Sequence, residues 1–207
     1  FSDNKKAHAH YGRYVGQELL DITRNIFPLS HKREDTFIAG FSMGGYGAVR
    51  NGLKYSKNFS KIGMISPALI TDDLVNYTDD NNVLYSKEFY ESIFGDLDKI
   101  EGSDINPRYL IEHTEDIPDI YLACGIDDFL FSKCADFYLF LREKEIDATF
   151  VGDEGEHTWE FFDKYIKEFI KTLILALNPY NPCKIMIRTK AEVKEVAKIL
   201  FKAGIKE

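Results

Sequence analysis

Apolar residues follow two different spacings along this chain. Some segments are short and almost continuously apolar, as in strands that are buried on both faces of a sheet. These are residues 36–41, 61–66, 119–124 and 148–151. Other segments repeat apolar residues every three or four positions, as amphipathic helices do. These are residues 8–27, 43–55, 131–145 and 158–177. Because strands that alternate with helices need crossover connections, the pattern predicts an α/β fold with a mostly parallel sheet.

One long segment interrupts this alternation. Residues 71–118 are polar, acidic and irregular apart from a short amphipathic piece at 88–94. A long excursion inside a compact domain more often forms a lid or a pocket wall than a spacer. We therefore expect a catalytic domain over residues 1–178 with a lid-like excursion at 71–118. After the proline-containing stretch NPYNP, residues 183–207 are expected to form an extra strand and a basic amphipathic helix.

The composition limits the possible partners and compartments. The chain has 207 residues, 44% hydrophobic and 14% aromatic, which is enough to bury one globular core. A net charge of -8 disfavours binding to nucleic acid or to an anionic membrane. Cys124, Cys134 and Cys183 show no disulfide or zinc spacing, so reduced thiols in the cytoplasm are the simple reading. An export signal stays open as an alternative, because the sequence opens on Phe1 and its first methionine is Met43.

A serine lies at the junction between a predicted strand and a predicted helix. Residues 40–44, GFSMG, fit the pattern G-x-S-x-G, which in α/β-hydrolases is a tight turn that exposes the serine hydroxyl. The glycines let the chain pass close to a strained serine backbone. Ser42 is therefore the candidate nucleophile, and the amide of Met43 is the candidate oxyanion donor. The alternative is a glycine-rich turn without chemistry.

An acid and a base follow in the order expected of a hydrolase. Asp127 and Asp128 come just after a predicted strand, and we take Asp128 as the acid. The alternative is that both aspartates only cap the following helix. His157 lies between the last predicted strand and helix and is the candidate base, unless its role is purely structural. The remaining histidines fit surface positions, two of them on the first helix: His8, His10, His31 and His113.

Together these residues predict ester chemistry. His157 would take the proton of Ser42 as it attacks an ester carbonyl, while Asp128 stabilises the imidazolium, and no metal or organic cofactor is needed. Phe129 and Trp159 are candidates for lining the site of a small-molecule acyl ester, as are Tyr90 and Phe94; core packing explains each of them equally well. Transfer of the acyl group to a sugar or alcohol acceptor is a second hypothesis, and a noncatalytic binding module is a third.

Four segments resemble the putative-esterase family of α/β-hydrolases, which contains esterase D, S-formylglutathione hydrolases, tributyrin esterases and feruloyl esterases. They are IAGFSMGGYGAVRNGLKY, FGDLDKIEGSD, ACGIDDFLF and GEHTWEFFDKYI, in the family's order. The resemblance covers roughly residues 1–177. It implies an α/β-hydrolase fold with helices on both faces of the sheet, and serine esterase activity without a cofactor. It also implies Ser42 as nucleophile, Asp128 rather than Asp127 as acid, and His157 as base.

The resemblance also reveals a departure. Family members have further strands and a His-Gly oxyanion loop before the helix that opens this chain, and that loop supplies the second oxyanion donor. Loss of one donor typically costs about 100-fold to 1000-fold in turnover, so we expect weak catalysis from this sequence alone. Without those strands, residues 36–41 would form an unpaired apolar sheet edge. We therefore expect a missing N-terminal segment or a second chain to complete the sheet.

Overall fold

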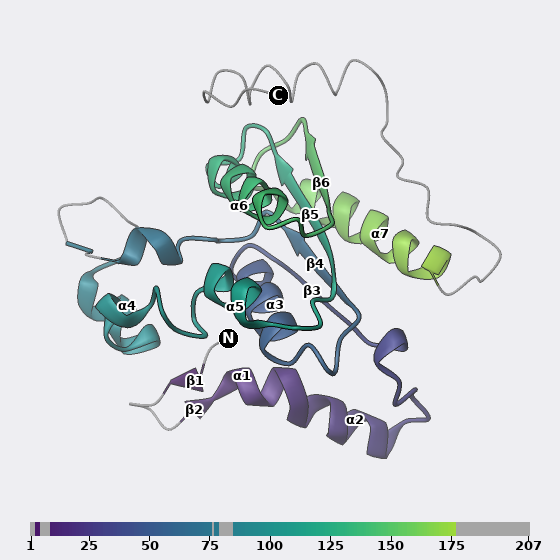
Figure 1. Ribbon diagram of the computed structural model, residues 1–207. Helices are drawn as coiled ribbons and strands as arrows, with labels where there is room; N and C mark the ends of the chain where they lie inside the picture. The colour runs from purple at the N-terminus through teal and green to yellow at the C-terminus, as the bar shows by residue number, and fades with distance from the viewer. Residues whose placement is uncertain (1–2, 5–8, 76, 79–84, 177–207) are drawn as a thin grey trace.

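A computed structural model of the chain describes residues 3–4, 9–75, 77–78 and 85–176 (Figure 1). Its centre is a sheet of four parallel strands, β3 (Phe37–Phe41), β4 (Lys61–Ile65), β5 (Asp119–Gly125) and β6 (Ala148–Asp153). They lie side by side in the order β3-β4-β5-β6. The α/β fold class predicted from the sequence is confirmed. The strand and helix predicted for residues 183–207 lie outside the described residues.

The two inner strands consist of residues that suit burial on both faces. β4 is buried from Ile62 onward, and β5 is buried from Ile120 onward. Helices from the crossover connections cover both faces of a parallel sheet, so such strands are apolar at nearly every position. Within the described residues β3 pairs only with β4, and it is at most partly buried. What completes the sheet beyond β3 stays a prediction.

Helices cover both faces of the sheet (Figure 1). On one face, α3 (Met43–Lys54) and α6 (Phe131–Glu143) pack against Leu122 and its neighbours in the core. On the other face, α7 (Trp159–Ala176) packs against Tyr121 and Ala123. Alternate residues of β5 thus face opposite layers, as the two-residue period of a strand requires. No helix in the described ranges combines the length and apolar character needed to cross a bilayer.

The excursion at 71–118 is more regular than its sequence predicts. It contains α4 (Lys87–Phe94), α5 (Pro107–His113) and short 3-10 turns at Thr71–Leu74 and Leu97–Lys99. The expectation of a single amphipathic piece is therefore wrong for α5. The Asn106 side chain accepts a hydrogen bond from the Arg108 amide at 2.9 Å, and proline takes the first helical position. Both features favour the start of a helix.

The excursion also has its own small core. Tyr46 of α3 packs there with residues of the excursion, which are Leu74, Tyr77, Tyr90, Phe94, Leu97 and Ile100. Tyr90 and Phe94, candidates for an acyl pocket, are both buried in this cluster. Packing in this cluster accounts for both rings, because their apolar surface is covered there.

A buried charge fastens the excursion to α3 just before α5. Arg50 is 1% exposed, and its Nη2 lies 2.7 Å from Asp104 Oδ2. The same guanidinium donates through Nε to the Asp104 carbonyl at 3.0 Å and through Nη1 to Asn51 Oδ1 at 2.8 Å. Burial alone would raise the pKa of Asp104, but the hydrogen bond from Lys54 and the charge of Arg50 together lower it.

The N-terminal segment departs from the predicted helix over residues 8–27. Two short antiparallel strands, β1 (Asp3–Asn4) and β2 (Ala9–His10), come first, so His10 lies in a strand and not on a helix. The helical part consists of α1 (Tyr11–Arg13), a π-helical turn (Tyr14–Glu18) and α2 (Leu19–Ile26). Its apolar residues Leu19, Ile22 and Ile26 are exposed, whereas its buried residues are glycines 12 and 16. The apolar face therefore does not contact the described core.

Candidate active site

Ser42 lies in the turn that joins β3 to α3. Its φ of 53° and ψ of -124° fall in a region that residues with a Cβ rarely occupy. The Ser42 amide donates to the Ile65 carbonyl at 3.0 Å, and the Ser42 carbonyl accepts from the amides of Gly45 and Ala68, both at 3.0 Å. Strained backbone of this kind persists only where the surrounding structure enforces it, and it gathers at functional sites.

Close approach of the backbone explains two glycines in this turn. A Cβ on Gly40 would lie 2.2 Å from the Gly44 carbonyl oxygen, and a Cβ on Gly45 would lie 2.9 Å from Pro67 Cα. A Cβ on Gly44 would meet no atom within 4 Å. Gly44, the second glycine of the G-x-S-x-G pattern, is therefore not required by the packing. Gly45, the residue after it, is required.

Two hydrogen bonds join Ser42, His157 and Asp128 in a chain. His157 Nε2 lies 2.9 Å from Ser42 Oγ, and His157 Nδ1 lies 2.8 Å from Asp128 Oδ2. Because an ionised carboxylate can only accept, Nδ1 carries the proton and donates it to Asp128. Nε2 then presents its lone pair to the serine hydroxyl, which donates to it. This arrangement can deprotonate the serine during attack on a carbonyl carbon.

The two neighbouring aspartates lie in different environments. The Asp128 side chain is fully buried, whereas Asp127 is exposed. Asp128 also accepts a hydrogen bond through Oδ1 from the Leu130 amide at 2.9 Å. One carboxylate therefore stabilises the turn before α6 and contacts His157 at the same time. The N-cap of α6 is Leu130 and no side chain of the described residues caps this helix, so the alternative that the two aspartates cap it is wrong.

Met43 is the first residue of α3 and is exposed beside Ser42. The first amides of a helix lack an intrahelical acceptor and lie at the positive end of the helix dipole. An amide in this position suits stabilisation of negative charge that develops on a substrate oxygen next to Ser42.

Aromatic rings surround the His157 imidazole. The ring centroids of Phe129 and Phe162 each lie 4.9 Å from that of the imidazole. Trp159 makes an edge contact with Phe41 at 5.0 Å. Phe129 and Trp159 are 66% and 69% exposed, so both offer apolar surface to a bound molecule. Sequence reasoning missed Phe41 and Phe162, whose only signal was their nearness in the chain to the serine and the histidine.

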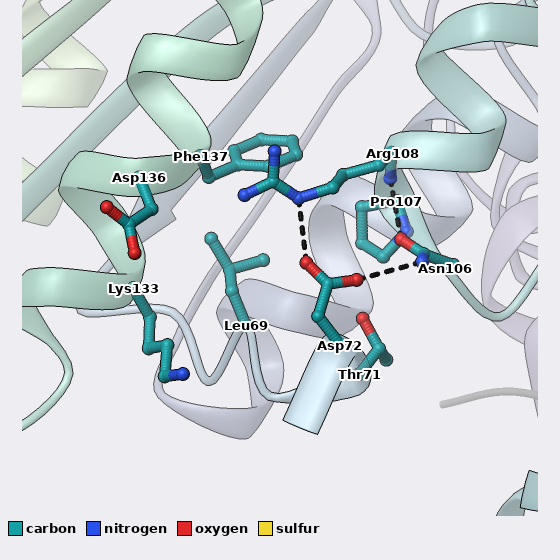
Figure 2. A pocket seen from close by; sticks show the side chains of 9 residues that line it. All are labelled: Leu69, Thr71, Asp72, Asn106, Pro107, Arg108, Lys133, Asp136 and Phe137. Carbon is teal, nitrogen blue, oxygen red and sulfur yellow. Dashed lines mark hydrogen bonds and ion pairs between the residues drawn. The ribbon is translucent and has the colours of Figure 1, made fainter. Parts of the chain in front are cut away.

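A separate cavity of about 140 Å³ lies between the loop after β4, α5 and α6 (Figure 2). Arg108 Nε donates to Asp72 Oδ2 at 2.7 Å, and Asn106 Nδ2 donates to Asp72 Oδ1 at 2.9 Å. Its lining contains none of the predicted site residues; it consists of Leu69, Thr71, Asp72, Asn106, Pro107, Arg108, Lys133, Asp136 and Phe137. These contacts join two parts of the excursion, the turn at Thr71–Leu74 and the start of α5. In the part of the chain that the structure describes, no three His, Cys, Asp or Glu residues are grouped to hold a metal ion.

Comparison with known proteins identifies the family. A family model described as putative esterase matches residues 2–174. This chain belongs to the putative esterase family. The family resemblance of its sequence motifs is therefore confirmed. Solved structures of α/β-hydrolases also resemble the fold of this esterase family member.

Three relatives of this esterase family member illustrate the match. An acetyl esterase from Caldicellulosiruptor saccharolyticus is 43% identical over an alignment of 171 residues that covers 80% of this chain and 64% of that protein. S-formylglutathione hydrolase from Staphylococcus aureus gives a TM-score of 0.69 at 30% identity, covering 81% of this chain and 65% of that one. The fluorophosphonate-binding serine hydrolase FphF from the same organism gives 0.67 at 31% identity, covering 81% and 64%. The chain thus spans less than two thirds of each relative.

Proposed function

We propose that Ser42, His157 and Asp128 form the catalytic triad of a serine carboxylesterase that hydrolyses small acyl esters. The observation that carries this proposal is the unbroken chain of hydrogen bonds from the serine hydroxyl through both imidazole nitrogens to a buried carboxylate. The strained backbone of Ser42 supports it independently, because strain at a non-glycine residue needs a reason.

The reaction follows from the roles of these groups. Ser42 Oγ attacks the ester carbonyl carbon as its proton passes to His157 Nε2, and the Met43 amide stabilises the oxyanion. The tetrahedral intermediate collapses when Nε2 returns this proton to the leaving alcohol, which leaves the acyl group on Ser42. Water then attacks the acyl carbon and gives a proton to Nε2. Nε2 passes this proton to Ser42 Oγ as the bond between that oxygen and the acyl carbon breaks, which releases the carboxylic acid and restores the serine. Asp128 stabilises the imidazolium in both halves of the reaction.

The names of the relatives guide the choice of substrate. An acetyl esterase and an S-formylglutathione hydrolase both carry very short acyl groups in their names. We therefore propose acetyl and similarly short esters as substrates, with Phe129 and Trp159 contacting the substrate beside His157. A cytoplasmic location stays a prediction, supported by the free thiols of Cys124 and Cys134.

Release of p-nitrophenol from p-nitrophenyl acetate tests the proposal. We expect slow turnover by the chain, and Ser42→Ala should reduce it to the rate without protein. Asp127→Asn is the matched control for the acid, because it removes an exposed carboxylate next to Asp128 without touching the imidazole. It should retain activity to within about threefold. Equal rates for wild type and Ser42→Ala would refute the proposal.

A further inference from the structure

Ser42 and His157 come from opposite edges of the described sheet. Ser42 follows β3 and His157 follows β6. Strands β4 and β5 lie between β3 and β6 (Figure 1). Neighbouring strands are about 4.8 Å apart, so β3 and β6 are separated by about 14 Å. The segment between β6 and α7 must therefore carry the imidazole back across two strands. Other contacts must therefore fix the position of the His157 imidazole next to Ser42.

Backbone hydrogen bonds hold this segment on the acid side. The Ile126 amide donates to the Asp153 carbonyl at 2.9 Å, and the Asp127 amide donates to the Gly155 carbonyl at 3.1 Å. Both bonds tie the histidine segment to the loop that carries Asp128. Toward Ser42 the segment is held by the His157–Ser42 hydrogen bond and by aromatic rings.

One buried ring reaches both partners. Phe162 lies in the first turn of α7, and its amide donates to the Thr158 carbonyl at 3.1 Å. Its ring lies 4.9 Å from the His157 imidazole at an interplanar angle of 83°. It also stacks on Phe41, the residue before Ser42, at 5.1 Å and 15°. A single rigid side chain therefore touches the base and the strand that carries the nucleophile.

We propose that Phe162 is a positioning residue, whose ring fixes the His157 imidazole relative to Ser42. The inference rests on the proposed esterase function. Phe162 does not touch the reacting atoms, so its effect must pass through the imidazole. Displacing a catalytic group by about 1 Å can cost about 100-fold in rate. Loss of the ring should therefore lower kcat much more than it changes KM.

Phe169 offers a matched control on the same helix. It is as deeply buried as Phe162 and two turns further along α7, where its ring lies 5.6 Å from that of Tyr121. Phe162→Leu and Phe169→Leu should lower the melting temperature by similar amounts. Only Phe162→Leu should lower kcat, by about tenfold or more, with KM within about threefold. Phe162→Tyr keeps an aromatic ring and should retain kcat within about threefold of wild type. If Phe162→Leu does not fold, Phe162→Met takes its place.

Proton NMR supplies a readout that core packing alone would not move. The proton on His157 Nδ1, which the imidazole donates to Asp128, should give a downfield signal in wild type and in Phe169→Leu. It should broaden or vanish in Phe162→Leu, because a displaced imidazole exposes that proton to exchange. Equal kcat and equal signals in the two leucine variants would overturn the inference and leave the esterase proposal standing. Turnover that survives Ser42→Ala would instead refute the esterase function, and the inference with it.

Discussion

Substituting Ser42 by glycine should stabilise the protein relative to alanine. Both variants lose the hydroxyl and its bond to His157, so they differ only in the Cβ and in backbone freedom. The φ of 53° and ψ of -124° at this residue strain any side chain with a Cβ but not glycine. Ser42→Ala keeps the strain, and Ser42→Gly removes it.

The size of the difference follows from two opposing terms. Backbone strain of this kind is worth about 1 to 3 kcal/mol. Glycine lowers the free energy of unfolding by about 0.5 to 1 kcal/mol relative to alanine, because the unfolded chain has more conformational freedom at a glycine. The net advantage of Ser42→Gly is therefore about 1 kcal/mol. In a protein of this size that corresponds to about 2 to 4 °C in melting temperature.

Thermal unfolding followed by circular dichroism measures the difference. Ser92 provides the control, because it lies within the regular helix α4. There the order should reverse, with Ser92→Gly less stable than Ser92→Ala by about 1 kcal/mol. If Ser42→Ala melts at or above Ser42→Gly, the turn is not strained, and this argument for a functional serine fails.

The other predictions concern the acid, the buried charge and the glycines. Asp128→Asn should reduce kcat for p-nitrophenyl acetate by about 10⁴-fold, and a reduction under tenfold would exclude Asp128 as the acid. Asp104→Asn should lower the free energy of unfolding by about 2 kcal/mol at pH 7; the cost is less than for a fully buried pair because the Asp104 side chain is 39% exposed. Because the folded pKa of Asp104 is lowered, its contribution is complete above the unfolded pKa of about 3.9 and is lost as pH falls through the folded pKa. The stability gap between wild type and Asp104→Asn in urea should therefore shrink below about pH 4, and a constant gap would contradict this reasoning. Gly40→Ala should cost at least about 3 kcal/mol in urea unfolding, whereas Gly44→Ala should stay within about 1 kcal/mol; equal costs would show that the turn is not tight at Gly40.

Local patterns sufficed for the sheet and for the choice of candidate site residues. Ser42, Asp128 and His157 each follow a predicted strand, and the carboxyl ends of parallel strands lie at the same edge of a sheet. The glycines on either side of Ser42 also indicated a tight turn, which few sequences can form. These signals depend only on residues that are neighbours in the chain, and not on the tertiary structure.

What the sequence did not predict depends on contacts between distant residues. The apolar residues of α2 are exposed although their spacing is that of a buried helix, because burial depends on what packs against a face. Helix α5 was missed because seven residues within an acidic segment give a weak periodic signal. Phe161 and Phe162 are adjacent and both buried, and only the tertiary structure shows that it is Phe162 that lies against His157 at 4.9 Å.

Covalent labelling tests the central claim most directly, because it detects an activated serine even where turnover is slow. The chain would be incubated with a fluorophosphonate, and its intact mass and peptide masses would then be measured. The proposed triad predicts one adduct, located on Ser42, which forms much more slowly in His157→Gln. A protein that stays unmodified, or that carries the adduct on another residue, would contradict the claim that His157 and Asp128 activate Ser42.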